Sequence, residues 1–299
     1  MPALKKLRES GYKILAVITA PDKPVGREKT ITPPPVKITA QELGLKILQP
    51  PKLRGNSQFW DELKSLGDIG LGVVAAYGKI IPEEILELPK FGLLNIHPSL
   101  LPKYRGASPI QAVLSNGETE TGVTIMKLDK EMDHGPILAQ KKVEIKPNEK
   151  YPELSERLSE IGSDMLIDIL PDYFAGKIKP AEQNHSSATL TKIIKKEDGK
   201  ADWSLGANWL YNTYRAFYPW PGLWTEWEGK ILKIIECSPD DAVITAKADT
   251  GALAIDGGKL GFICGKGFLI VKSLQRAGEK ILSDSQFIQG YGKLIKKIP

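Results

Sequence analysis

The stretch LLNIHPSLLPKYRG, residues 93–106, is the segment that decides the fold class, because an apolar run passes directly into a loop with polar side chains. The run contains Asn95 and His97, and Pro98 opens the loop. Residues two apart on a strand lie on the same face, so Leu93, Asn95 and His97 share a face if the strand reaches His97. Open α/β folds bind ligands at the carboxyl ends of their strands. The stretch therefore predicts an α/β protein with a polar site at the end of this strand.

The loop after His97 is stiff and then basic. Pro98 and Pro102 fix φ at two positions and lack backbone donors. Lys103 and Arg105 follow and add positive charge beside the predicted site, although two basic residues are also typical of a solvated surface patch. An amide and an imidazole at a strand end can likewise do no more than satisfy nearby backbone groups. This loop alone leaves both alternatives open.

A second polar loop, LDKEMDHG at residues 128–135, follows the strand-like stretch TGVTIMKL. Asp133 is its strongest candidate, because Gly135 and Pro136 predict a tight turn in which the carboxylate can point toward an imidazole. The same loop holds three alternatives, each of which is also typical of a turn former or a solvated charge: Asp129, Glu131 and His134. Three His and two Cys without an HExxH or CxxC spacing predict no metal site.

The composition predicts a soluble, cytoplasmic protein of about two domains. A length of 299 residues, 41% hydrophobic and 26% charged, is ordinary for globular proteins. No run of 18 apolar residues occurs, and the start MPALKKLRES is amphipathic, so we expect no membrane span and no export. Cys237 and Cys264 are too few for a disulfide framework, which fits a reducing compartment.

The net charge of +5 lies in the second part of the chain. Residues 1–175 carry 23 Lys+Arg and 23 Asp+Glu, whereas residues 176–299 carry 18 and 13. A basic domain beside a neutral one is the footprint expected for a polyanion such as RNA, bound through phosphate contacts. An excess of this size is also compatible with a role in solubility alone.

Turn residues divide the first part of the chain into a predicted α/β domain over residues 1–175, with a mostly parallel sheet. Five apolar runs are expected to be buried strands: Tyr12–Thr19, Leu45–Leu48, Gly70–Ala76, Leu93–His97 and Gly122–Leu128. Helical segments are expected at Pro82–Leu88 and Ala107–Leu114. Apolar residues at spacings of three and four predict a long amphipathic helix over Pro152–Phe174 that closes the domain.

The second part begins with a polar, lysine-rich stretch, residues 176–200, which is typical of a linker. Residues 201–299 then contain a predicted helix over Asn208–Phe217 and short runs with glycine turns, which indicate a small β-barrel. The motif PWPG at 219–222 lies close to three tryptophans: Trp220, Trp224 and Trp227. We expect these rings to fill the barrel core, and we assign RNA contact to exposed Lys and Arg.

Several separated motifs resemble the methionyl-tRNA formyltransferase family, from the first residues nearly to the last. NIHPSLLPKYRGASPIQ and ETGVTIMKLDKEMDHGPILAQ are similar to the two halves of the family's active site. PDKPVGREKTITPPPVK, residues 21–37, is similar to its basic loop beside the tRNA acceptor end. KEDGKADWS, FYPWPGLWT and LQRAGEKILSDSQFIQG are similar to its C-terminal domain.

The resemblance implies formyl transfer from 10-formyltetrahydrofolate to the amino group of initiator methionyl-tRNA, by a monomer that needs no metal. It places the catalytic groups at Asn95, His97 and Asp133. It implies that Asn95 is the oxyanion donor, that His97 either assists there or shuttles the amine proton, and that Asp133 orients His97 and raises its pKa. It places the folate-binding edge at Ser99, Leu100, Leu101 and Pro102. It places contacts to the tRNA at Lys23, Arg27 and Lys29.

The fold implied is a Rossmann-like formyltransferase domain with its first strand missing, followed by an OB-like β-barrel domain that binds tRNA. Family members open with a short strand and a GTPxFA-type turn, whereas MPALKKL resembles the helix that comes next. Glycinamide ribonucleotide formyltransferase resembles the first domain only, so the presence of residues 201–299 argues against it. Two alternatives stay open: sugar-nucleotide formyltransferases keep a second domain, and a truncated copy could bind tRNA without catalysis.

Overall fold

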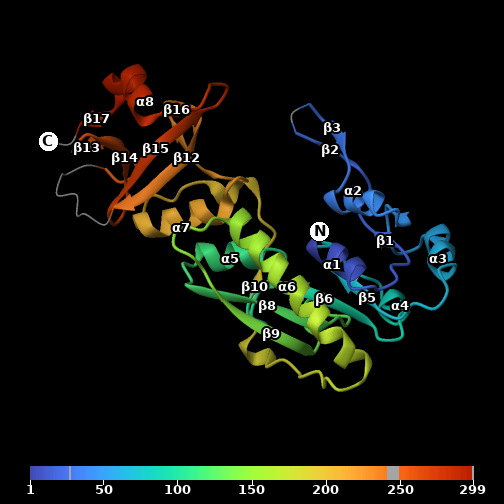
Figure 1. Ribbon diagram of the computed structural model, residues 1–299. Coiled ribbons are helices and arrows are strands. Elements are labelled where there is room, and N and C mark those ends of the chain that lie inside the picture. Colours follow the sequence, from blue (N-terminus) through green and yellow to red (C-terminus); the bar gives the residue numbers. More distant parts are fainter. Residues whose placement is uncertain (27, 241–248, 298–299) are drawn as a thin grey trace. The chain divides into compact units, whose positions relative to one another are not determined.

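The computed structural model describes residues 1–26, 28–240 and 249–297 and divides into two compact units (Figure 1). The first unit consists of Met1–Ala107, Glu120–Glu144 and Ser155–Thr191. The second consists of Ser108–Thr119, Ile145–Leu154 and Lys192–Pro299. The domain boundaries predicted from the sequence, 1–175, 176–200 and 201–299, stay a prediction.

The main sheet of the first unit has four strands in the order β5 (Gly72–Val74), β6 (Leu93–His97), β8 (Glu120–Lys127) and β9 (Ile137–Glu144). β5 pairs with β6 in parallel, whereas β6–β8 and β8–β9 are antiparallel. The prediction of a mostly parallel sheet is therefore wrong for these strands. The prediction overlooked β9, whose polar side chains hide its pattern, and the short connection from β8 to β9 permits only an antiparallel pair.

Three smaller pairs of strands complete the first unit. β1 (Val17–Ile18) lies parallel to β4 (Ile47–Leu48), β2 (Lys23–Val25) lies antiparallel to β3 (Thr30–Thr32), and β7 (Arg105–Gly106) lies parallel to β10 (Leu190–Thr191). The strand predicted over residues 12–19 is thus only two residues long. Four helices belong to this unit in addition to most of α6: α1 (Pro2–Glu9), α2 (Pro35–Glu42), α3 (Ser57–Lys64) and α4 (Glu83–Leu86).

One apolar cluster joins these elements into a core. Its buried members come from β4, β6, α3, α4 and the loop before α3: Leu48, Leu53, Phe59, Leu63, Ile85 and Leu93. Ile18 of β1 and Val74 of β5 pack against the same cluster. Leu93 therefore fixes the start of β6 in the core, and the polar residues of β6 follow at its other end.

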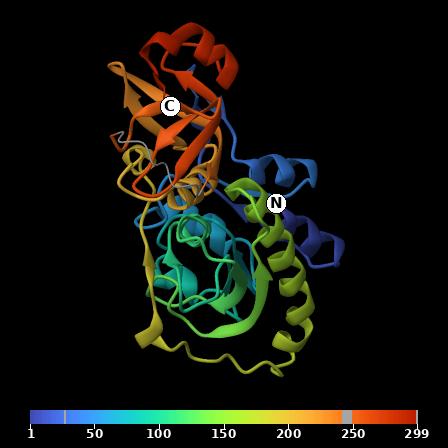
Figure 2. The same ribbon diagram turned by 90° about the vertical axis from the view of Figure 1, so that its left-hand side faces the viewer.

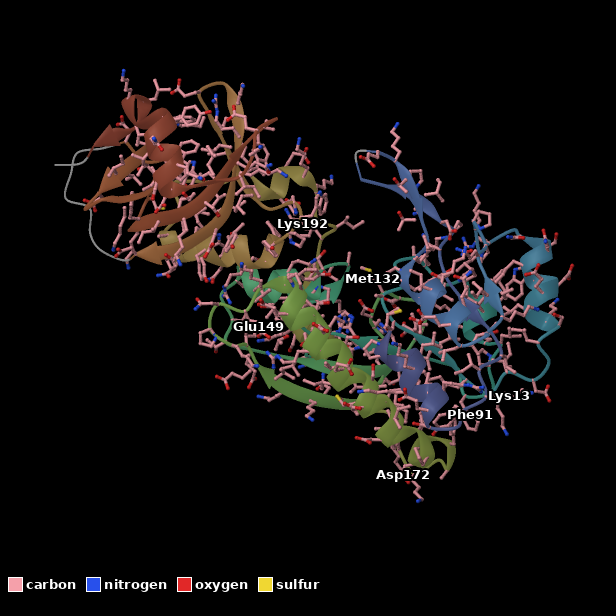
Figure 3. All side chains as sticks on the ribbon, turned by 45° about the horizontal axis from the view of Figure 1, so that its top comes forward. Lys13, Phe91, Met132, Glu149, Asp172 and Lys192 are labelled. Carbon is pink, nitrogen blue, oxygen red and sulfur yellow. The ribbon has the colours of Figure 1, made fainter. Side chains whose placement is uncertain are left out.

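The long helix α6 (Tyr151–Phe174) covers one face of the main sheet, as Figure 2 shows. A Cβ on Gly162 would lie 2.5 Å from Ile96 and 2.9 Å from Val123, so the absence of a side chain lets the helix approach β6 and β8 closely. Phe91 lies beside the end of α6 where Asp172 is labelled in Figure 3, and its ring meets that of Phe174 edge-on at 4.9 Å. Ile96 therefore points into packing, on the face opposite Asn95 and His97.

The chain after α6 runs back around the main sheet instead of leaving it (Figure 2). Ala181 forms an antiparallel bridge with Ile137 at the start of β9. The 3₁₀ helix η1 (His185–Ser187) and strand β10 follow, and β10 pairs with β7 directly after the loop that ends β6. Residues 181–191 thus reach the same loops that hold the predicted site.

The second unit is built on a sheet in the order β11-β12-β15-β14-β13-β17, with β16 paired to β15. All its neighbouring strands are antiparallel except β13 and β17. The strands are β11 (Leu223–Trp227), β12 (Lys230–Asp240), β13 (Leu253–Asp256), β14 (Lys259–Ile263), β15 (Phe268–Arg276), β16 (Leu282–Ser283) and β17 (Lys296–Lys297). The helices are α5 (Pro109–Ser115), α7 (Ala207–Phe217) and α8 (Asp284–Tyr291), with 3₁₀ turns η2 (Lys196–Gly199) and η3 (Gly292–Leu294).

The tryptophans near the PWPG motif differ in burial. Trp224 is buried, and Trp227 packs against the core cluster of the sheet, as expected. Trp220 is 59% exposed, so the prediction that it fills the core is wrong. Pro219 and Pro221 flank it, and the prolines turn the chain so that its ring leaves the core.

In the described ranges, no helix has both the length and the apolar character needed to cross a bilayer.

Candidate active site

Strand β6 places Asn95 and His97 at its carboxyl end. Asn95 lies in register with Val74 of β5 and Met126 of β8, and His97 lies in register with Thr124 of β8. Because β6 has a hydrogen-bonded neighbour on both sides, the positions of these two side chains are set by the sheet. The predicted strand bounds, Leu93–His97, are confirmed.

Asp133 reaches the same place from the loop between β8 and β9. Its Oδ1 lies 3.4 Å from Asn95 Nδ2 and 3.6 Å from His97 Nδ1, while its Oδ2 accepts a 2.7 Å hydrogen bond from the backbone N–H of Gly106. Its backbone has φ of +51°, in the left-handed region. Met132, labelled in Figure 3, precedes it and is largely exposed. The structure thus brings together the three side chains that the sequence singled out.

The position of His97 determines which of its nitrogens can act as a base. Its side chain is buried, and Nε2 lies 3.1 Å from the carbonyl oxygen of Tyr104. A carbonyl only accepts, so Nε2 carries the proton and donates it. In the neutral ring, Nδ1 then has the lone pair, and it faces the Asp133 carboxylate at 3.6 Å.

Burial lowers the pKa of His97 below its ordinary value of 6.5. The Asp133 carboxylate and the hydrogen bond to Tyr104 act in the opposite direction, and they are outweighed by the loss of solvation of the charged ring. The expectation that Asp133 brings about a raised pKa is therefore wrong in its net direction. His97 is neutral near pH 7, which is the protonation state that a general base requires.

A consequence for stability follows from this lowered pKa. The pKa of His97 is 6.5 in the unfolded chain and lower in the folded protein. The contribution of neutral His97 to folding stability is therefore present above pH 6.5 and is lost as the pH falls through the pKa of the folded state. Thermal unfolding between pH 7.5 and 5 should therefore show a falling midpoint, and the fall should be smaller in His97→Gln, which keeps a donor for Tyr104. Equal pH dependence in the two proteins would contradict this prediction.

The loop predicted to bind folate is held mainly by its own internal bonds. Ser99 is fully buried, and its Oγ donates to the carbonyl of Lys103 at 2.7 Å. The N–H of Leu101 donates to Thr124 Oγ1, and the carbonyl of Leu101 accepts from Gln140. Leu100 and Pro102 are partly exposed. The fixed backbone of this loop, with those two side chains, is the surface that it presents.

A polar network that includes buried Arg105 and Gln183 contacts the Asp133 loop, and most of it was not predicted from the sequence. Arg105, expected either to add positive charge beside the site or to lie in a solvated surface patch, is 7% exposed and donates from Nε and Nη2 to Gln183 Oε1 at 3.1 and 2.6 Å. Arg105 Nη2 also lies 2.8 Å from His185 Nδ1, and the His185 ring stacks on His134 with centroids 3.9 Å apart. Gln183 lies in a polar stretch with no periodic pattern, so the sequence contained no signal for it.

The alternatives to Asp133 have structural roles. Asp129 pairs through Oδ2 with His134 Nδ1 at 2.7 Å and accepts the backbone N–H of Glu131 through Oδ1 at 2.9 Å. Asp129 is therefore a turn former, as its alternative interpretation stated. In the part of the chain that the structure describes, no group of three or more His, Cys, Asp or Glu is placed to hold a metal ion.

Within the basic loop of residues 21–37, β2 and β3 pair as a hairpin, and residues 35–37 begin α2. Lys23 and Lys29 are exposed on it, and neither ammonium pairs with a carboxylate of a described residue. Arg27 lies outside the described residues. The base of the hairpin is anchored by Asp22, whose carboxylate accepts from Gln49 at 2.8 Å and from Lys37 at 2.7 Å, and these two bonds lower its pKa.

Comparison with known proteins assigns the chain to a family. The formyl transferase family model matches residues 2–170, and the model for the formyl transferase C-terminal domain matches residues 193–292. The methionyl-tRNA formyltransferase of Caldicellulosiruptor saccharolyticus is 42% identical over 295 residues, covering 96% of this chain and 92% of that protein. This chain belongs to the methionyl-tRNA formyltransferase family. The family's two-domain fold and its enzyme class are confirmed for this chain.

Further methionyl-tRNA formyltransferases agree with this assignment, and a solved structure shares the fold. The Listeria welshimeri protein is 40% identical over 298 residues, 99% of this chain and 94% of that protein. The Chloroflexus aurantiacus protein is 48% identical over 236 residues, 79% and 76% of the two chains. An N-formyltransferase of Helicobacter canadensis, solved with folinic acid and dTDP-3-aminofucose, shares the fold at a TM-score of 0.63 and 20% identity, covering 92% and 94%.

Proposed function

We propose that this member of the methionyl-tRNA formyltransferase family transfers the formyl group of 10-formyltetrahydrofolate to the α-amine of initiator methionyl-tRNA, in the cytoplasm and as a monomer. The observation that supports it is the convergence of Asn95 Nδ2 and His97 Nδ1 on Asp133 Oδ1, at 3.4 and 3.6 Å. A donor, a base and a carboxylate in one place are the groups that acyl transfer to an amine requires. The identity of the two substrates, the folate donor and methionyl-tRNA, follows from the family to which the chain belongs.

The amine needs little activation. An α-amine has a reference pKa of about 7.7 to 8.0, so a substantial fraction is neutral near pH 7. The neutral nitrogen attacks the formyl carbon, and a carbon–nitrogen bond forms while the carbonyl oxygen becomes an oxyanion. Asn95 Nδ2 donates to this oxyanion. The bond between the formyl carbon and N10 of the folate then breaks, so no covalent enzyme intermediate is required.

The proton follows a path through His97. Nδ1 of neutral His97 accepts the proton that the attacking nitrogen loses, and the imidazolium that forms lies beside the Asp133 carboxylate. Nδ1 can then return this proton to N10 as it leaves, so the ring is neutral again after each turnover. Asp133 thus stabilises the charged ring only during the reaction, which agrees with the lowered pKa of His97 at rest.

The substrates are assigned to loops around this centre. We place the folate along Ser99, Leu100, Leu101 and Pro102, where a stiff backbone and partly exposed side chains of Leu100 and Pro102 are available. We place the tRNA acceptor end at Lys23, Arg27 and Lys29, with further phosphate contacts to the basic second part of the chain.

Formylation by the purified chain tests the proposed function. The assay uses methionyl-tRNA and 10-formyltetrahydrofolate and measures formyl-methionine released after hydrolysis of the ester. An amino-sugar nucleotide and uncharged tRNA serve as parallel substrates. We expect transfer to methionyl-tRNA alone. Transfer to the amino sugar alone, or tRNA binding without any transfer, would overturn the proposal in favour of the two remaining alternatives.

The hairpin predicts a specific salt effect. Replacing both Lys23 and Lys29 with Ala should raise the KM for methionyl-tRNA, leave the KM for the folate unchanged, and reduce the slope of log KM against log salt by about one for each phosphate that the hairpin no longer binds. Lys46→Ala combined with Lys64→Ala removes the same charge from exposed positions in the first unit and is the control. Equal effects of the two pairs would show that net charge, and no hairpin contact, is responsible.

A further inference from the structure

Gln183 has a buried side-chain amide, and its polar atoms bind the turn that contains Asp133 and the neighbouring Arg105. Its side chain is 5% exposed, and Nε2 donates to the backbone carbonyls of Asp133 at 2.9 Å and Gly135 at 2.7 Å. Its Oε1 accepts both bonds from Arg105. We infer that Gln183 is a positioning residue, which holds the loop of Asp133 in the conformation that brings the carboxylate to His97 and Asn95.

The loop needs such support because its backbone is unusual. A non-glycine residue at φ of +51° lies in a sparsely populated region, and it persists when its surroundings hold it there. The two carbonyls that Gln183 binds lie on either side of His134, so one side chain fixes both ends of this turn. A Cβ on Gly135 would lie 2.1 Å from the carbonyl oxygen of Lys127, so the turn is also pressed against the end of β8.

The direction of the Gln183 amide is determined by its partner. A guanidinium only donates, so the oxygen of the amide must face Arg105 and both N–H groups must face the turn. Arg105 begins β7, and the next residue, Gly106, donates its N–H to Asp133 Oδ2. The pair of Arg105 and Gln183 therefore links the strand that holds the Asp133 carboxylate to the turn that holds its backbone.

The outer side of the turn is held by a second contact. His185, two residues after Gln183, stacks on His134 with an angle of 3° between the rings, and its Nδ1 lies beside Arg105. Gln183 and His185 thus hold the turn from a segment about 50 positions further along the chain, and we call these two residues the clamp. This inference rests on the proposed function, since Asp133 acts on His97 there.

Two substitutions test the clamp. Gln183→Glu keeps an acceptor for Arg105 and loses both donors to the turn. Gln183→Leu loses the acceptor for Arg105 as well as the donors to the turn. We expect each to lower kcat about 10- to 100-fold, with both KM values within about twofold, because small displacements of a catalytic group have effects of this size. Tyr173→Phe is the control for stability, because it removes a 2.7 Å bond to the carbonyl of Phe91, within the same unit. Its kcat should not change.

A double-mutant cycle separates positioning from general destabilisation. If Gln183 acts through Asp133, Gln183→Leu should lower kcat by less than about twofold when Asp133 is already Asn. The same loss in both backgrounds, or a kcat close to wild type for Gln183→Glu, would overturn the inference.

A second measurement tests the clamp independently of enzymatic activity. If the wild-type chain transfers no formyl group, the proposed function fails, and the clamp is then judged by NMR of the His97 ring nitrogens. Gln183→Leu should lower the pKa of His97 further, because Asp133 leaves its place and its raising effect on the ring is lost. A His97 titration identical to that of the wild type would overturn the clamp.

Discussion

Asp133→Asn is expected to lower kcat by about 1,000- to 10,000-fold, the loss known for a buried carboxylate that serves a catalytic imidazole. The bond from Gly106 requires an acceptor, so the amide oxygen must occupy the place of Oδ2. The amide nitrogen then takes the place of Oδ1 and presents donors to His97 Nδ1 and Asn95 Nδ2. The base loses its lone pair to this donor, and the imidazolium loses its counter-charge.

Single-turnover kinetics at saturating substrates, with KM measured for both substrates, provide the readout for this variant. Because Asn and Asp have nearly the same shape and both tolerate positive φ, the fold should be retained, and unfolding curves would show it. Asp129→Asn, in the same loop, is the matched control, since its Oδ1 can still accept the N–H of Glu131. A kcat for Asp133→Asn within tenfold of wild type would remove Asp133 from the mechanism.

Asn95→Asp is expected to lower kcat by about 100- to 1,000-fold, the cost of removing one oxyanion donor. A carboxylate at this position cannot donate to the oxyanion, and its charge lies next to Asp133 Oδ1, which Asn95 Nδ2 approaches to 3.4 Å. The new carboxylate also raises the pKa of His97 by the attraction between opposite charges, so the ring holds its proton to a higher pH. The pH at which activity is half-maximal should therefore rise.

A matched substitution controls for the chemical change itself. Asn56 accepts the N–H of Phe59 at the start of α3, and Asp serves equally well as a helix cap, so Asn56→Asp should leave kcat and stability close to wild type. Turnover by Asn95→Asp near the wild-type rate would show that another group binds the oxyanion. If Asn95→Asp loses turnover because it unfolds, the role of Asn95 is tested instead with Asn95→Leu, which is nearly isosteric and adds no charge.

In the proposed mechanism, neutral His97 and the Asp133 carboxylate act as one functional unit. The protein excludes water from the ring, which makes the resting base neutral, and keeps the carboxylate within 3.6 Å to stabilise the ring when it is charged. In the proposed reaction, burial therefore keeps the resting ring neutral, and the counter-charge stabilises the charged ring. A residue that holds Asp133, such as Gln183, affects the stability of the charged ring, which is why its loss should appear both in kcat and in the pKa of His97.

Local pattern was sufficient for the parts of the fold in which a few neighbouring residues determine the outcome. Apolar residues and the prolines after them placed a strand at Leu93–His97, and helical spacing placed α6 within one residue of its observed bounds. These features depend on periodicity and on the fixed φ of proline, which act over a few residues. The α/β class and the family resemblance followed from the same stretches, and the comparisons confirm both.

Only the tertiary structure decided how these stretches work together. The antiparallel pairing of β9 depends on a partner strand and a short connection, which a single polar segment does not reveal. The lowered pKa of His97 depends on every atom that excludes water from the ring, so the sequence alone led to the wrong direction. Gln183 and His185 contact the loop of Asp133 only because the chain returns around the sheet after α6. The sequence by itself determined which residues have the chemistry, and tertiary structure determined which of them meet, because burial and long-range contact are properties of the folded chain.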